Sequence, residues 1–322
     1  MTQGAPQQTE LQQDEAVLLA HALVARVTER TGARALFVKG PTAVALGVRP
    51  ARPSSDVDVL VDPASFDATC AAMEAAGWQL RTPLGSLRYA GEFAFDHSAH
   101  YIHPHWPVDV DVHYSFPGFL ADPSAAFDAL WERRTDVEVA GRPAPTPDRL
   151  GQALVVGLHA LRDPEKAQSR QDLAHLGAVL ANLTPADRDA LRGLARDTGA
   201  SGTGAELLRL AGTSPLPLSP EEEDRLVDWE LRRQGHGVGT VWLVELTEAP
   251  WRARAAVLGR ALVPPREHFV ASTSAADLSR AQLAGLHLRR WGRGLTGAPH
   301  ALTVLLRRRS ARTSTETRTR ER

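Results

Sequence analysis

The segment Asp56–Val61 carries two carboxylates two residues apart inside an apolar run rich in β-branched residues. Side chains at i and i+2 of a β-strand project from the same face, so Asp56 and Asp58 are expected side by side, with the intervening valines facing the core. Two adjacent like charges are unfavourable unless a cation compensates them, and Mg²⁺ is commonly bound by one or two carboxylates together with substrate phosphates. The segment therefore predicts a strand with a metal site, although the pair alone also fits a strand end with two solvated aspartates.

A second acidic strand is expected over Val108–His113, where apolar and polar residues alternate strictly. Its side chains Asp109, Asp111 and His113 face one side, and its valines face the other. If this strand lies beside the first, three carboxylates converge, which is enough to hold two divalent ions for phosphoryl or nucleotidyl transfer. The alternative for this strand by itself is an edge strand with a solvated acidic face.

The composition is that of a globular protein long enough for two domains, with 322 residues, 43% of them apolar and 23% charged. A net charge of −1 gives no overall indication of nucleic-acid or membrane binding. The Arg-rich end, residues 307–322, is expected to be a disordered tail, and it alone leaves nucleic acid open as a partner. The single cysteine, Cys70, excludes an intramolecular disulfide, and no signal peptide or long apolar run is recognisable, so a cytoplasmic location is expected.

Four regions are expected along the chain: a disordered N-terminus (1–13), an alternating helix and strand domain (14–143), a helical domain (144–306) and the tail (307–322). In the second region, the periodicity predicts a helix over 14–31, strands over 35–38 and 56–61, a short helix over 43–46, a helix over 63–77, and short strands over 78–80, 92–95 and 101–103. The third region repeats helix start signals and apolar stripes, which favours an irregular helical bundle.

These motifs, in this order, resemble the nucleotidyltransferase superfamily typified by DNA polymerase β. Its pattern is a glycine turn after the first strand, a D-x-D strand and a third acidic residue on a later strand, here Gly40, Asp56 with Asp58, and Asp111. Within the superfamily the chain is similar to a poorly characterised bacterial group whose turn reads Lys-Gly, as in Lys39-Gly40, and whose third acid is followed by a histidine, as in Asp111-Val112-His113.

The resemblance implies an α+β fold, with a mixed sheet flanked by helices and followed by an α-helical domain. It also implies Mg²⁺-dependent (or Mn²⁺-dependent) transfer of a nucleoside monophosphate from an NTP to an acceptor, with release of pyrophosphate. Asp56, Asp58 and Asp111 would then be the catalytic and metal-binding residues. The implied nucleotide-binding residues are Lys39, Gly40, Thr42, Ser54 and Ser55. Asp109 remains an alternative third carboxylate and, like His113, a candidate to support a metal ligand.

One departure from the superfamily concerns the phosphates. Typical members have Gly-Ser in the turn, whereas Pro41 follows Gly40 here and has no N–H to offer a phosphate. The loop arginines Arg49 and Arg52 could contact phosphates or simply maintain solubility. On the predicted helices, His159 and Asp172 could line a cleft or form a structural polar pair.

Two other functions remain open at this point. A catalytically silent nucleotide-binding or scaffold protein would keep the same fold, and the substituted turn favours it. A metal-dependent phosphohydrolase would use the same carboxylates with a group of nearby histidines: His97, His100, His103 and His105.

Overall fold

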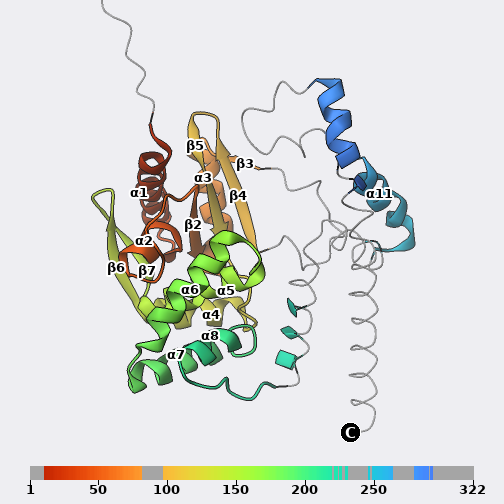
Figure 1. Cartoon of the computed structure of the whole chain (residues 1–322). Coiled ribbons are helices and arrows are strands. Elements are labelled where there is room, and N and C mark those ends of the chain that lie inside the picture. Colours follow the sequence, from red (N-terminus) through yellow and green to blue (C-terminus); the bar gives the residue numbers. More distant parts are fainter. Residues whose placement is uncertain are drawn as a thin grey trace, which may run out of the picture.

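The computed structural model describes residues 11–81 and 97–219, together with shorter stretches between 221 and 292 (Figure 1). Within these residues the central sheet has the strand order β1-β2-β5-β4-β3. The strands are β1 (Ala35–Val38), β2 (Asp56–Val61), β5 (Trp106–His113), β4 (Ser98–His103) and β3 (Gln79–Leu80). Strands β2 and β5 run parallel and the other neighbours run antiparallel, so the sheet is mixed.

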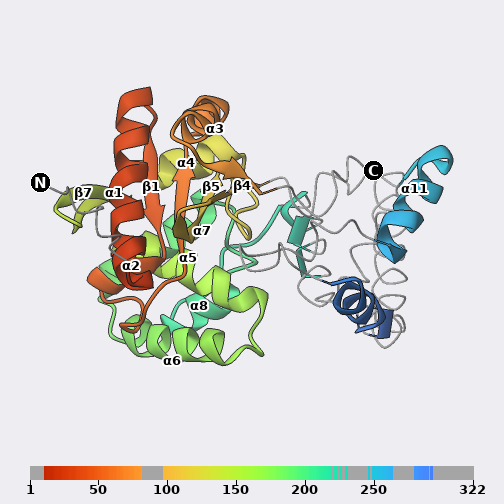
Figure 2. The ribbon, with the colours of Figure 1, turned by 90° about the horizontal axis from the view of Figure 1, so that it is seen from above.

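Helices cover both faces of this sheet, and Figure 2 shows the three layers from above. On one face, α1 (Gln13–Thr31) and α3 (Phe66–Ala75) pack on the valines of β2 and β5. On the other face Leu36 and Val38 of β1, together with Leu60 of β2, join the core of a group of helices. These are α4 (Pro123–Trp131), α5 (Arg149–Arg162), α6 (Ala167–Ala181), α7 (Pro185–Asp197) and α8 (Ala205–Leu210). The expected mixed sheet flanked and followed by helices is confirmed.

A hairpin that the sequence did not predict comes in the chain between the strands of the central sheet and helix α5. Strands β6 (Arg134–Val139) and β7 (Arg142–Pro147) are joined by Ala140 and Gly141, both with positive φ, as a two-residue hairpin turn requires. The expected domain boundary at residue 143 falls inside β7. Thr146 of β7 donates a hydrogen bond to the Phe37 carbonyl oxygen of β1 at 2.7 Å, so the chain continues directly from the sheet into the helical part.

The first predicted helix and the first two predicted strands agree with the structure. Helix α1 ends at Gly32, whose φ of 67° is the left-handed conformation expected of a C-terminal glycine. The predicted helix over 63–77 is instead a 3₁₀ turn, η1 (Pro63–Ser65), followed by α3, and α2 (Gly40–Ala45) begins three residues before the predicted short helix. The expectations for residues 92–95, for the tail and for residues 1–10 of the expected N-terminal region 1–13 lie outside the described residues, and Gln13 at the end of that region already belongs to α1.

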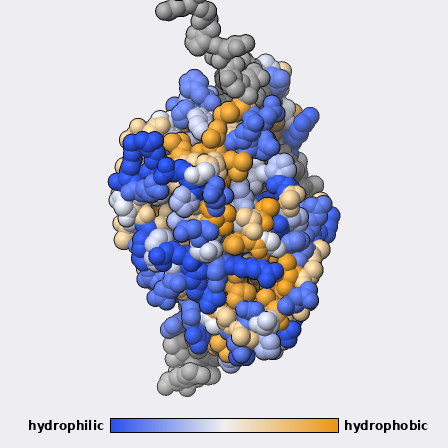
Figure 3. All heavy atoms as spheres, turned by 90° about the vertical axis from the view of Figure 1, so that its left-hand side faces the viewer, coloured by the Kyte–Doolittle hydropathy of each residue, from blue (hydrophilic) through white to orange (hydrophobic). Residues whose placement is uncertain are grey.

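Beyond residue 219 the structure describes parts of further helices, including α11 (Trp251–Leu262). None of the described helices combines the length and the apolarity needed to cross a membrane. The face of the molecule at the left of Figure 1 is hydrophilic over most of its area, with apolar residues interspersed (Figure 3).

Candidate active site

The register of the sheet brings the two acidic strands together. Because β2 and β5 are parallel neighbours, Asp58 lies directly beside Asp111, and Asp56 lies beside Asp109. Ligand atoms of Asp58, Asp111 and His113 all lie within 4.8 Å of one another, and in the described part of the chain these three residues form the group that could hold a metal ion. Of the three carboxylates that the sequence predicts to converge, Asp58 and Asp111 belong to this group, His113 is its third member, and Asp56 lies outside it.

Asp58 is the buried centre of this group. Its Oδ1 accepts from the Lys39 ammonium at 2.6 Å and from His113 Nε2 at 3.0 Å. Burial raises the pKa of Asp58, but Lys39 and His113 lower it by more, so this pKa lies well below the ordinary value for aspartate. Asp58 is therefore a carboxylate at neutral pH, and Lys39 occupies the position of a compensating cation.

Asp56 lies in a different electrostatic environment, although it shares a face with Asp58. Burial, followed by the neighbouring charge of Asp58, raises the pKa of Asp56 to about 6, against the opposing effect of Lys39. Among the described residues it has no ion-pair partner, unlike Asp58. A carboxylate in this state gains from a bound cation, which would favour its charged form.

The structure also separates the two candidates for the third carboxylate. Asp111 Oδ1 bonds to His100 Nδ1 at 2.5 Å, and the Asp111 side chain is 18% exposed. Asp109 pairs with Arg81 at 2.7 Å, and its side chain is 40% exposed. Asp111 thus lies with Asp58 and His113, whereas Asp109 lies outside the group.

Lys39 is held in position by an unusual turn. Its φ of 59° and ψ of −149° lie in a region that side chains other than glycine rarely adopt, so surrounding contacts must maintain it. The buried Gln152 of α5 supplies them: its Oε1 accepts from Lys39 N at 3.0 Å, and its Nε2 donates to Phe37 O at 2.9 Å. The following Gly40, with a φ of 46°, allows the chain to turn directly into α2.

Two residues expected to bind nucleotide are not in a position to do so. Thr42 is fully buried, and its hydroxyl donates to Lys39 O at 2.9 Å and accepts from Gln152 Nε2 at 3.0 Å. Gly40 is also buried, against Ser54 and His21. These contacts stabilise the turn, so Thr42 and Gly40 support the site from behind rather than line it.

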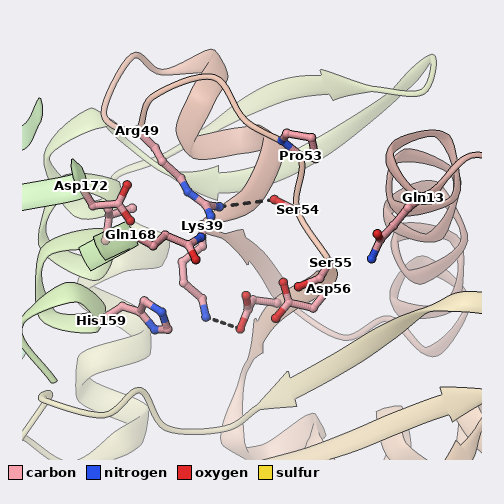
Figure 4. A pocket seen from close by; sticks show the side chains of 12 residues that line it. Gln13, Lys39, Arg49, Pro53, Ser54, Ser55, Asp56, His159, Gln168 and Asp172 are labelled. Carbon is pink, nitrogen blue, oxygen red and sulfur yellow. Dashed lines mark hydrogen bonds and ion pairs between the residues drawn. The ribbon is translucent and has the colours of Figure 1, made fainter. Parts of the chain in front are cut away.

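The other residues expected to bind nucleotide, Lys39, Ser54 and Ser55, line a pocket of about 320 Å³ between the sheet and the helices (Figure 4). Its lining residues are Gln13, Lys39, Arg49, Pro53, Ser54, Ser55, Asp56, Asp58, Val156, His159, Gln168 and Asp172. Lys39, Ser54 and Ser55 are thus brought together with the D-x-D pair. His159, which was only a weak candidate, also lines the pocket. The charge of Lys39, followed by desolvation of the ring among the pocket residues, lowers the pKa of His159 to about 3, which leaves the ring neutral.

Several contacts that shape the pocket were not apparent from the sequence. Arg52 forms a two-pronged pair with Asp172 of α6, at 2.7 and 2.6 Å, and so ties the loop before β2 to the helical part. With its amide oxygen turned toward the loop, Gln168 accepts from Arg52 Nη2 at 2.9 Å. The loop arginines were visible as candidates, but no local pattern distinguished Gln168 or Gln152 from other helical residues.

The histidines near the site divide between two places. His97 stacks on His113 with ring centroids 5.7 Å apart, and burial lowers the pKa of His97 to about 3. His103 and His105 instead contact each other, and His103 packs near Trp78. The nearby histidines therefore do not converge on one metal position within the described residues.

Comparisons with known proteins give two findings. A model of a family described as uncharacterised nucleotidyltransferase matches residues 3–213. Among solved structures, the chain is similar to an antigenic nucleotidyltransferase-like protein from Paracoccidioides brasiliensis, at 14% identity and a TM-score of 0.37, over 62% of this chain and 94% of that chain. A search of curated protein sequences found no match.

Proposed function

This chain belongs to the uncharacterised nucleotidyltransferase family, and we propose that it transfers a nucleoside monophosphate from an NTP to an acceptor nucleophile, with release of pyrophosphate. The observation that carries the proposal is the parallel register that sets Asp111 beside Asp58, which lines the pocket together with Lys39. The acceptor would approach from the helical side of the pocket, and nucleic acid stays open as a partner only through the Arg-rich end of the chain.

The donor set fits a divalent cation. Two carboxylates and one imidazole lie within reach of a common ion, and the partly neutralised Asp56 lies beside them. Carboxylate oxygens suit Mg²⁺ and Mn²⁺, and an imidazole suits transition metals, so Mn²⁺ is compatible with His113 as well. We assign Asp58, Asp111 and His113 to the ion, with Asp56 adjacent. A bound cation would neutralise phosphate charge and lower the pKa of the attacking hydroxyl.

The residues of this chain would act on substrate as follows. The acceptor oxygen attacks the α-phosphorus, and the bond from that phosphorus to the oxygen bridging to the β-phosphate breaks. Asp111 Oδ2 would take the acceptor proton, because Oδ1 is engaged by His100. The Lys39 ammonium would move from Asp58 to a phosphate oxygen once a cation replaces it. Ser54 and Ser55 would donate hydroxyl hydrogen bonds to the phosphates.

The test is transfer of label from an α-labelled NTP, with Mg²⁺ or Mn²⁺, to protein, RNA or pooled small-molecule acceptors. The double variant Asp56→Ala with Asp58→Ala should abolish transfer while its circular-dichroism spectrum stays that of the wild type. Transfer that survives in the double variant would contradict the assignment of the D-x-D pair.

A silent nucleotide-binding protein is the second candidate. The Lys39–Asp58 ion pair and the missing N–H at Pro41 favour it, because both make the site less like an open metal and phosphate site. Calorimetry with Mg²⁺ and each NTP, combined with a pyrophosphate assay, separates the two functions. Binding without pyrophosphate release in the presence of any acceptor would favour the silent protein.

A further inference from the structure

The turn after β1 lacks the donors that would hold a triphosphate. Pro41 has no N–H, and the Thr42 hydroxyl is buried in hydrogen bonds within the turn. A triphosphate carries several negative charges, and Lys39 is one cation that also neutralises Asp58. If the pocket binds an NTP, a second positively charged group has to hold the phosphates beyond the reacting one.

Arg49 is placed for this purpose on the loop between α2 and β2. Its side chain lines the pocket and points toward Ser54, whose Oγ accepts from Arg49 Nη1 at 3.4 Å (Figure 4). With its amide oxygen turned toward the loop, Gln168 also accepts from Arg49 Nη2 at 3.3 Å, on the side of the helical part. The buried Arg49 Nε has no hydrogen-bond partner. The guanidinium is thus aimed by neutral groups, and each of its two terminal nitrogens uses only one of its two N–H donors in these contacts.

The charges of the pocket point to the same group. Lys39 is compensated by Asp58, and Arg52 outside the lining is compensated by Asp172. Apart from these two ion pairs, the pocket has Asp56 at one end and Arg49 at the other, and within the described residues neither of them forms an ion pair. The nearby charge of Arg52 adds to burial in lowering the pKa of Arg49, so an anion beside Arg49 relieves an unfavourable environment.

We infer that Arg49 binds the β- and γ-phosphates of the NTP, and that it takes over the part of the phosphate cradle that the Gly40-Pro41-Thr42 turn cannot supply. Ser54 and Gln168 orient the guanidinium, which suits phosphate because its planar fork donates two parallel hydrogen bonds. This inference rests on the proposed function for the identity of the nucleotide, but the anion site itself can be tested without any transfer reaction.

The experiment is calorimetric titration with inorganic tripolyphosphate, ATP and AMP, each with Mg²⁺, on the full chain. Arg49→Gln should raise the Kd for tripolyphosphate and ATP about tenfold or more and leave that for AMP within about twofold, because AMP lacks the outer phosphates. Arg49→Lys should give an intermediate loss. The matched control is Arg134→Gln on β6, an exposed arginine outside the pocket, which should bind all three like the wild type. Melting temperatures of the variants establish that each is folded.

Three results would overturn the inference: equal tripolyphosphate affinity in wild type and Arg49→Gln, an equal loss for AMP and ATP, or absence of tripolyphosphate binding to the wild type. Failure of the proposed function is distinguishable from these results. A protein that binds tripolyphosphate through Arg49 but transfers no nucleotide would contradict nucleotidyl transfer and leave the Arg49 assignment intact.

Discussion

Replacing Lys39 with methionine should have opposite effects on folding and on metal binding. The Lys39 ammonium contacts Asp58 Oδ1 at 2.6 Å, with the two side chains 13% and 5% exposed. Removing one partner of a buried ion pair costs about 3–5 kcal/mol because the other charge remains buried without compensation. His113 still donates to the same oxygen, so we expect Lys39→Met to lower the free energy of unfolding by about 2–3 kcal/mol.

The chain's only other lysine provides a matched control. Lys166 pairs with Asp163 at 2.8 Å, but its side chain is 71% exposed. Lys166→Met should therefore change the free energy of unfolding by about 0.5 kcal/mol or less. Urea denaturation of wild type and both variants, monitored by circular dichroism, measures the difference.

The affinity for a divalent cation should instead be higher in Lys39→Met. The ammonium and a divalent cation compete for Asp58, so Lys39→Met should bind Mn²⁺ more tightly than wild type. With Mn²⁺ at ten times its Kd, the variant should recover about 1.4 kcal/mol of stability. Equal stability of Lys39→Met and Lys166→Met, or equal stabilisation of Lys39→Met and wild type by Mn²⁺, would refute this account of the ion pair.

Three further predictions follow from single contacts. The pKa of Asp56 is about 6 in the folded protein against 3.8 in the unfolded chain, so between pH 4 and 6 the folded protein keeps a proton that the unfolded chain has lost. As the pH rises through that window, the free energy of unfolding of the wild type should fall by up to about 3 kcal/mol relative to that of Asp56→Asn, as measured by urea denaturation. Gln152→Leu should cost about 3 kcal/mol by leaving buried groups unpaired, whereas the exposed Gln79→Leu should cost almost nothing in the same assay. Thr42→Val should lower the free energy of unfolding by about 1 kcal/mol and leave the Kd for tripolyphosphate within about twofold of the wild-type value, whereas Ser54→Ala should raise that Kd. A larger increase in Kd for Thr42→Val than for Ser54→Ala in calorimetry would contradict the placement of both hydroxyls.

The sequence predicted those parts of the fold whose signals are local. The apolar and alternating runs placed β1 and β2 at their observed bounds, because side-chain periodicity follows directly from strand geometry. Hairpin β6–β7 was missed because Pro143, Pro145 and Pro147 argue against a strand, and because its Ala140-Gly141 turn lacks the usual asparagine or aspartate. Prolines are tolerated along a strand edge that pairs with no further strand, because no N–H donor is needed there, but which edge is unpaired is known only from the tertiary structure.

The candidate site was predictable in its residue types and not in its pairings. Asp58 and Asp111 could be expected to face a common site, but the register that sets them side by side depends on which strands are neighbours. The Lys39–Asp58 ion pair depends on a backbone conformation that no local pattern indicates for lysine. Contacts across more than a hundred residues, such as those of Gln152 and Asp172, likewise follow from the packing of helices on the sheet.

The choice between two aspartates on β5 tests the central claim most directly. Asp111 and Asp109 share a strand and a face, but only Asp111 lies with Asp58 and His113 in the candidate metal group of the described residues. In transfer of label from an α-labelled NTP, Asp111→Asn should lower the rate about a hundredfold or more, and Asp109→Asn should stay within about threefold of wild type. Equal rates for the two variants, or a larger loss in Asp109→Asn, would contradict the site described for this nucleotidyltransferase.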